Sequence, residues 1–202
     1  MLEHTDIEQA KNLFKVWDLH HAWHHPTPEF IEHAKRKAQH SLTLAIYLLD
    51  KLEQTTELKD NTAATLWIIA QSYYSMFFEV EYLLGLDAKK LPDGTKDTHK
   101  TVYLAFLYYY VIKGSELEQK KTRELTTSRM SKALALFKEL QDEAWELQRL
   151  QKSVQDLKTQ REQRHAFTYR MNRAAEVSEA KKSIAKAVEF RQLVEEYILA
   201  RK

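Results

Sequence analysis

Basic side chains gather in one stretch of the chain, and they are the residues best suited to chemistry. The cluster comprises Arg161, Arg164, His165, Tyr169, Arg170 and Arg173. The guanidinium group of arginine binds phosphate through paired hydrogen bonds. An imidazole that titrates near neutral pH can carry a proton to or from an ester oxygen. The cluster therefore predicts a phosphate site with His165 as a candidate proton carrier. A solvated helix end, whose cations complement the helix dipole, explains the same residues equally well.

Four histidines near the start of the chain form a second candidate site. They are His20, His21, His24 and His25. If one helix carries them, the pairs His20/His24 and His21/His25, each spaced by four residues, place two imidazoles on one face. Such a pair supplies two ligands for Zn²⁺. No carboxylate stands at the spacing of a HExxH motif, and the helix must continue up to Pro26 for the pairs to align. We therefore favour surface histidines at a helix end and predict no metal and no cofactor.

Aromatic side chains form a third group, which could stack nucleic-acid bases. The group comprises Trp67, Tyr73, Tyr74, Tyr82, Tyr103, Tyr108, Tyr109 and Tyr110. Tyrosine is also favoured where a ring is buried and its hydroxyl reaches an edge of the core. Core packing is the favoured interpretation of most of these rings, and the helix that begins near Trp67 is expected to be core.

The composition favours long helices that position these groups. Only 3 glycines and 3 prolines occur in 202 residues, whereas strong helix formers are abundant, so we predict an all-α protein. The net charge of +2 is far from the positive field of a dedicated duplex-DNA binder. The chain has no cysteine, which excludes disulfides, thiolate zinc ligands and a cysteine nucleophile.

Neither a secretion signal nor a membrane span is predicted. The first residues include Glu3, His4, Asp6 and Glu8 in place of a basic segment followed by an apolar run. The apolar stretches fall short of the ~20 residues that a membrane-crossing helix needs. We therefore expect a cytoplasmic protein with no membrane partner.

Apolar residues recur every three to four positions along most of the chain, which predicts a succession of helices. The predicted helices cover residues 6–24, 28–52, 62–84, 98–113, 123–165 and 178–199. Thr27 and Pro28 begin the second helix, and Gly85 is expected to cap the third. Residues 1–26 are interpreted as a His-rich N-terminal helix, and residues 27–202 as an up-and-down helical bundle with one long helix.

Three segments in this order resemble the HEPN superfamily of small prokaryotic helical proteins. They are WIIAQSYYSMFFEVEYLLGL, then DTHKTVYLAFLYYYVIKG, then RHAFTYRMNRAAEVSEAKKSIAKAVEFRQLVEEYI. The resemblance covers residues 30–198 and leaves the His-rich helix outside. It implies a HEPN-type bundle that forms homodimers and, in catalytic members, pairs two Arg-x(4-6)-His motifs that cut RNA without a metal.

The resemblance also implies roles for individual residues. Arg164 stands at the position of the family arginine, but Tyr169 stands where catalytic members carry histidine, and an ordinary tyrosine is a poor base at pH 7. Arg161 and His165 are one residue short of the motif, although they share a helical face. His99 and Lys100 match the His-Lys loop of the family and are predicted to contact phosphate.

Three functions follow from these observations. The first is a HEPN-domain protein that binds RNA or nucleotide in a toxin–antitoxin or defence setting, with a nucleotidyltransferase-like partner protein. The second is a metal-independent endoribonuclease that uses Arg161 or Arg164 with His165. The third is a structural adaptor that docks partners on its long helix.

Overall fold

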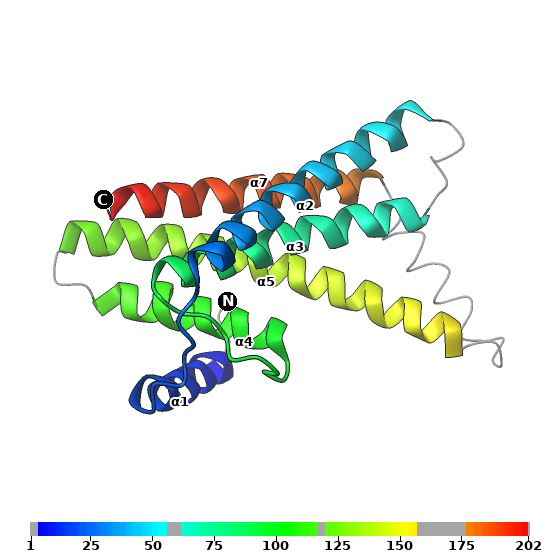
Figure 1. Ribbon diagram of the computed structural model, residues 1–202. Helices are drawn as coiled ribbons and strands as arrows, with labels where there is room; N and C mark the ends of the chain where they lie inside the picture. Colours follow the sequence, from blue (N-terminus) through cyan, green and yellow to red (C-terminus); the bar gives the residue numbers. More distant parts are fainter. Residues whose placement is uncertain (1–3, 56–61, 117–119, 157–176, 202) are drawn as a thin grey trace.

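The described part of the chain is almost entirely helical (Figure 1). A computed structural model describes residues 4–55, 62–116, 120–156 and 177–201, and within these ranges no strand occurs. The elements are α1 (His4–Leu19), α2 (Pro28–Gln54), α3 (Thr62–Leu86), α4 (Thr98–Phe106), the π-helix η2 (Leu107–Ile112), the 3₁₀-helix η3 (Lys113–Glu116), α5 (Lys120–Asp156) and α7 (Val177–Ala200). The all-α prediction is confirmed.

Helix α3 lies in the middle of the bundle and packs against α2, α5 and α7 (Figure 1). Its apolar residues cover nearly every face, and Met76, Val80 and Leu83 are completely buried. A helix that is apolar all round must be enclosed by neighbours. The prediction that this helix is the centre of the bundle therefore holds for most of its length.

Helix α2 begins as its sequence predicts and packs along α3. The Thr27 Oγ1 accepts a hydrogen bond from the Phe30 N–H at 3.2 Å, and Pro28 is the first helical residue. The prediction that Gly85 caps α3 is wrong, because α3 continues to Leu86 and Gly85 is helical. A Cβ on Gly85 would lie 3.0 Å from Ile31 Cγ1. The lack of a side chain on Gly85 therefore allows α2 to approach α3 closely.

Helix α1 ends earlier than the periodicity predicts. It stops at Leu19, His21 adopts a φ of 50°, and the Ala22 N–H bonds to the Trp17 carbonyl at 2.9 Å. The chain then turns so that His24 and Lys90 exchange two backbone hydrogen bonds of 3.0 Å. The four histidines therefore do not share a helical face. Within the described ranges, no group of three or more His, Cys, Asp or Glu residues is arranged to hold a metal ion.

Helix α4 continues through η2 and η3, so its extent agrees with the prediction while the π-helical segment was not foreseen. A π-helix widens the turn to i→i+5 hydrogen bonds. In this segment the neighbouring rings of Tyr108 and Tyr109 both contact Phe14 on α1, at centroid distances of 5.8 and 5.7 Å. The widened turn thus gives α1 a two-ring contact surface.

Helices α5 and α7 complete the bundle, and α5 extends beyond the other helices in Figure 1. The part of the long predicted helix that follows Asp156 lies outside the described residues. Helix α7 begins at Val177, one residue before the predicted cap Ser178, a difference within the usual uncertainty of a helix end. Among the described residues, no helix combines the length and the apolar character needed to cross a membrane.

Candidate functional site

All residues predicted for catalysis lie outside the described part of the chain, namely Arg161, Arg164, His165 and Tyr169. Two predicted phosphate-binding residues, Arg170 and Arg173, lie outside it as well. Their roles in phosphate binding and proton transfer stay predictions. Two other predicted residues, His99 and Lys100, are described, and they lie next to each other in the first turn of α4.

His99 points into the bundle, where α3 and α5 hold it. Its Nδ1 lies 2.8 Å from the Tyr73 hydroxyl, and its ring centroid lies 4.7 Å from that of Phe77. Gln141 on α5 donates to the same hydroxyl at 3.2 Å and to the His99 carbonyl oxygen at 3.3 Å. The hydroxyl therefore has its own proton left to donate to Nδ1, which favours a neutral ring. Burial also lowers the pKa of His99, which likewise favours the uncharged ring.

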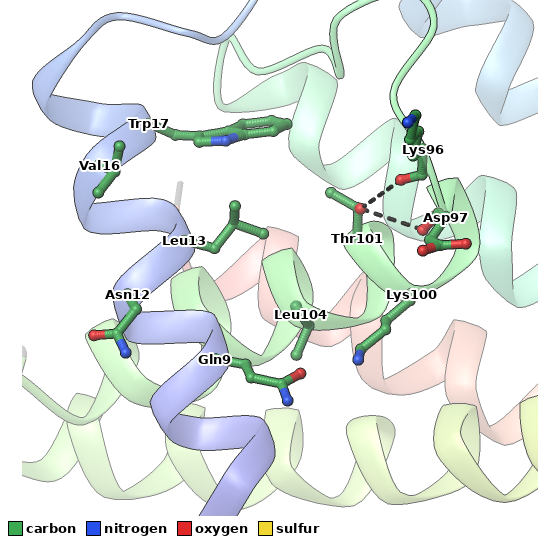
Figure 2. A pocket seen from close by; sticks show the side chains of 10 residues that line it. All are labelled: Gln9, Asn12, Leu13, Val16, Trp17, Lys96, Asp97, Lys100, Thr101 and Leu104. Carbon is green, nitrogen blue, oxygen red and sulfur yellow. Dashed lines mark hydrogen bonds between the residues drawn. The ribbon is translucent and has the colours of Figure 1, made fainter.

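Lys100 lies on the other side of α4 and lines a pocket of about 510 Å³ between α1 and the start of α4, which we call the α1–α4 pocket (Figure 2). The pocket is lined by Gln9, Asn12, Leu13, Val16, Trp17, Lys96, Asp97, Lys100, Thr101 and Leu104. Figure 2 shows Lys100 and Gln9 extending into the space between the two helices. The volume lies in the range of small-molecule sites, ~300–1,000 Å³.

The backbone of the connection before α4 brings Lys96 and Lys100 to the same pocket. Asp97 adopts a left-handed conformation with a φ of 50°, and its side chain makes no capping hydrogen bond. The Thr101 Oγ1 donates to the carbonyl oxygens of Lys96 and Asp97, at 3.4 and 3.2 Å. These bonds fold the connection back onto the first turn of α4. Lys96 and Lys100 consequently stand at the same pocket.

The charges around the pocket favour an anionic ligand. Two lysines, Lys96 and Lys100, face one carboxylate, that of Asp97. The first turn of α4 adds the partial positive charge of a helix start. Gln9 and Asn12 supply amide donors and acceptors, and the apolar remainder comes from Leu13, Trp17 and Leu104. A phosphate joined to a flat or apolar group fits this combination of residues.

An aromatic cluster holds α1 in place as the second wall of the pocket. Phe14 is completely buried. Its ring lies 5.4 Å from Trp17 in an edge arrangement and 5.5 Å from Trp23 in a stacked one. Tyr108 and Tyr109 cover it from the π-helix η2. The position of Trp17 in the pocket thus depends on this cluster.

Hydrogen bonds of Asp18, beside the aromatic cluster, hold the end of α1. Asp18 accepts hydrogen bonds from the Tyr109 hydroxyl and from Lys113 Nζ, the latter at 2.8 Å, and Trp23 Nε1 donates to the same hydroxyl at 2.9 Å. Burial on its own raises the pKa of Asp18, but the bonds from Lys113 and Tyr109 and the lysine charges together lower it. The carboxylate form is therefore the one that holds α1.

One face of α3 remains at the surface. It carries Trp67, Gln71, Tyr74 and Phe78, which we call the α3 stripe. Trp67 is 59% exposed and Tyr74 is 36% exposed, whereas Tyr73, Tyr103, Tyr108 and Tyr110 are buried. The core interpretation thus fits most of the rings but not Trp67. The α3 stripe and the α1–α4 pocket are adjacent at the start of α4. The His99 ring lies 5.9 Å from the ring of Tyr74, and the next residue, Lys100, lines the pocket.

No family model, no curated protein and no solved structure matches the chain. The chemistry of the α1–α4 pocket therefore carries the functional argument.

Several pocket residues were not among the sequence candidates. Gln9, Asn12 and Trp17 lie on α1, which falls outside the resemblance to HEPN proteins, and single amides and tryptophans occur on many helices. Lys96 was missed for another reason, since it stands outside the helix that carries Lys100. Their spacing of four residues across a predicted helix start was the one available indication that the two lysines lie together.

Proposed function

We propose that this protein binds RNA or a nucleotide and that the α1–α4 pocket receives a phosphate of the ligand. The observation that carries the proposal is the position of Lys100. This lysine, predicted from the sequence to contact phosphate, lines a pocket with a second lysine, Lys96. Nucleotides combine an anionic phosphate with a flat apolar base, and the pocket offers cations and an indole ring for those two parts.

The pocket favours a phosphate over an uncharged ligand for a physical reason. Hydrogen bonds to charged groups contribute about 1.5–3 kcal/mol, roughly twice the value for neutral pairs. Both lysines line the pocket, so an anionic ligand that fills it meets positive charge from two residues. The opposing carboxylate of Asp97 weakens the attraction without cancelling it.

Titration with ATP and with a short RNA tests the proposal. We expect wild-type protein to melt at a higher temperature with ATP present, since a ligand at 100 times its Kd stabilises the fold by about 2.7 kcal/mol. The double variant Lys96→Ala with Lys100→Ala should bind at least ~10-fold more weakly by calorimetry, because about 1.4 kcal/mol corresponds to tenfold in Kd.

Lys15→Ala is the matched control. Lys15 is an exposed lysine on α1 that does not line the pocket, so its loss removes one positive charge and leaves the pocket intact. Equal weakening by Lys15→Ala and by the pocket variant would show that only the overall charge matters. Such a result, or the absence of any binding to wild-type protein, contradicts the proposal.

The biological setting is part of the same proposal. The order of the three segments that resemble HEPN proteins supports a HEPN-type bundle that acts in toxin–antitoxin or defence systems as a homodimer. The same resemblance supports a nucleotidyltransferase-like partner protein, and the cytoplasmic location expected from the sequence belongs to the same proposal. Co-purification of such a partner with the tagged chain, and a dimer mass in light scattering, are the measurements that test this setting.

A further inference from the structure

The two walls of the α1–α4 pocket are held to the rest of the protein to different degrees. The wall from α4 is part of the core, since its residues from Thr101 to Phe106 are all buried. Helix α1 lies on the outside of the bundle against α4 and η2 (Figure 1), and only its Ala10 and Phe14 are buried. Elements with few buried contacts open locally at a lower free energy than the core does. Helix α1 is therefore the wall that opens first.

Hydrogen bonds from two tyrosines attach α1 to the core near its two ends. Near the start of α1, the Tyr103 hydroxyl donates to Asp6 Oδ2 at 3.2 Å. Near its end, the Tyr109 hydroxyl donates to Asp18, which also accepts from Lys113 Nζ at 2.8 Å. The residues that α1 contributes to the pocket lie between these two attachments. The position of this wall therefore depends on both of them.

The Tyr109 hydroxyl joins two further parts of the chain at one oxygen atom. It donates to Asp18 at the end of α1, and it accepts from Trp23 Nε1, in the connection to α2, at 2.9 Å. The Trp23 ring lies 5.0 Å from that of Trp17 in an edge arrangement, and Trp17 lines the pocket. Tyr109 does not line the pocket itself. Loss of its hydroxyl would therefore loosen α1 without removing a pocket side chain.

We propose that α1 is a movable wall and that its docking on the core is coupled to occupation of the pocket. A ligand between the two helices contacts Gln9, Asn12 and Trp17 only while α1 is docked. Because the ligand binds the docked state better, it shifts the equilibrium towards that state. By linkage, anything that loosens α1 opposes ligand binding. Tyr109 is the residue whose hydroxyl holds the docked state.

The inference rests on the proposed function, because it takes the ligand to be the phosphate-bearing molecule of the same pocket. It adds a mode of regulation, since whatever holds or releases α1 sets how much of the protein is competent to bind. The apparent Kd rises in inverse proportion to the docked fraction. The affinity therefore changes only once the undocked state is well populated, and the opening of α1 is the more sensitive quantity to measure.

Hydrogen–deuterium exchange of the whole chain, followed by mass spectrometry, measures this opening. Without ligand, we expect the amides of α1 to exchange faster than those of α3, which lies in the core. ATP, or the short RNA of the binding assay, at 100 times its Kd should slow exchange in α1 by roughly 100-fold. The reason is that a ligand that binds only the docked state lowers the opening by the factor 1 + [L]/Kd.

Tyr109→Phe removes the oxygen atom that joins Asp18 to Trp23 and keeps the ring. We expect exchange of the α1 amides to rise at least about tenfold in this variant, which corresponds to about 1.4 kcal/mol. The ligand should slow this faster exchange by the same factor as in wild-type protein, because the pocket side chains are intact. Unchanged exchange of α1 in the variant would contradict the role of the hydroxyl.

Tyr47→Phe is the matched control. Tyr47 is exposed on α2, so the substitution removes the same oxygen atom away from the pocket, and it should leave exchange in α1 unchanged. An equal rise in both variants would show a general effect and contradict the role of Tyr109. Circular dichroism melting checks that both variants are folded.

The possible results separate the two proposals. A ligand that slows exchange in α3 but not in α1 binds whether or not α1 is docked, which leaves the pocket proposal intact and overturns the movable wall. Exchange in α1 that is as slow as in α3 without ligand also overturns it, because α1 then opens only with the whole protein. If neither ATP nor RNA binds wild-type protein, both proposals are overturned.

Discussion

At the scale of single residues, Glu79 shows the largest conflict between side-chain chemistry and position. It lies on α3 with 7% of its surface exposed, near Lys35 of α2 and Arg191 and Glu195 of α7. Burial raises its pKa from 4.5 to about 7, although the charges of Arg191 and Lys35 oppose the rise. The folded state therefore prefers the protonated carboxyl.

This preference predicts how stability depends on pH. The raised pKa means that the folded state holds its proton between pH 4.5 and about 7 while the unfolded state has released it, so stability falls as pH rises through this window. A rise from 4.5 to about 7 corresponds to at most about 3 kcal/mol. We expect Glu79→Gln to increase the free energy of unfolding at pH 8 by about 1–3 kcal/mol and to change it little at pH 4.

Urea unfolding at the two pH values measures the effect. Glu8→Gln is the control, because Glu8 is exposed on α1. An equal gain from Glu79→Gln at pH 4 and pH 8 would contradict the assignment of the pH dependence to this carboxyl.

At the scale of elements, the approach of α2 to α3 depends on the missing side chain of Gly85. Replacing a helical glycine by alanine ordinarily stabilises a helix by about 1 kcal/mol. Here the added Cβ would lie 3.0 Å from Ile31 Cγ1, which opposes that gain. The packing of two helices, and not the end of one, selects glycine at this position.

We expect Gly85→Ala to leave stability nearly unchanged and Gly85→Leu to reduce it by about 1–3 kcal/mol through overpacking. Combination with Ile31→Ala should recover part of the loss, because the two residues are in contact and their effects couple. Thermal unfolding of the single and double variants measures this coupling. Additive losses would show that Gly85→Leu acts elsewhere than at Ile31.

Helix α1 is held beside α4 by residues far away in the sequence. The pocket exists because Phe14 is enclosed by Tyr108 and Tyr109 of the π-helix and because Asp18 binds Tyr109 and Lys113. Helix α1 contacts α4 and η2 and contributes half of the pocket lining. An N-terminal helix that lies outside the resemblance to HEPN proteins thus contributes directly to the candidate site.

At the scale of the whole molecule, the alternative function is endoribonuclease activity. The hypothesis assigns phosphate stabilisation to Arg161 or Arg164 and proton transfer to His165, and it requires no metal. We expect any RNA cleavage by the purified protein to persist in EDTA and to fall at least ~100-fold in Arg164→Ala with His165→Ala, since general acid–base catalysis contributes ~10²–10⁴-fold.

Gel analysis of a labelled RNA follows the reaction, and Lys15→Ala serves again as a control for lost charge. A cleavage rate that does not change in the double variant would rule out these residues. Loss of cleavage in EDTA would instead point to a metal-dependent activity.

The sequence by itself determined the helical class, because scarce glycine and proline and a repeat of three to four residues leave few alternatives. It also determined the start of α2, since Thr27 and Pro28 act locally. Lys100 was placed next to phosphate chemistry by its resemblance to a motif; the structure shows that it lines a pocket, and its contact with phosphate stays a prediction. The end of α1 was not predictable from the same reasoning, because the chain leaves the helix at His21, with a φ of 50°, and His24 then pairs with Lys90, far away in the sequence.

Tertiary structure decided which of several similar residues are available to a ligand. Trp67 and Tyr73 lie on the same apolar helix, yet one ring is 59% exposed and the other 3%, because the neighbouring helices cover α3 on all faces but one. Gly85 and Ile31 meet only when two helices cross. Periodicity describes each helix alone, whereas the pocket and the stripe arise from which helices stand beside each other.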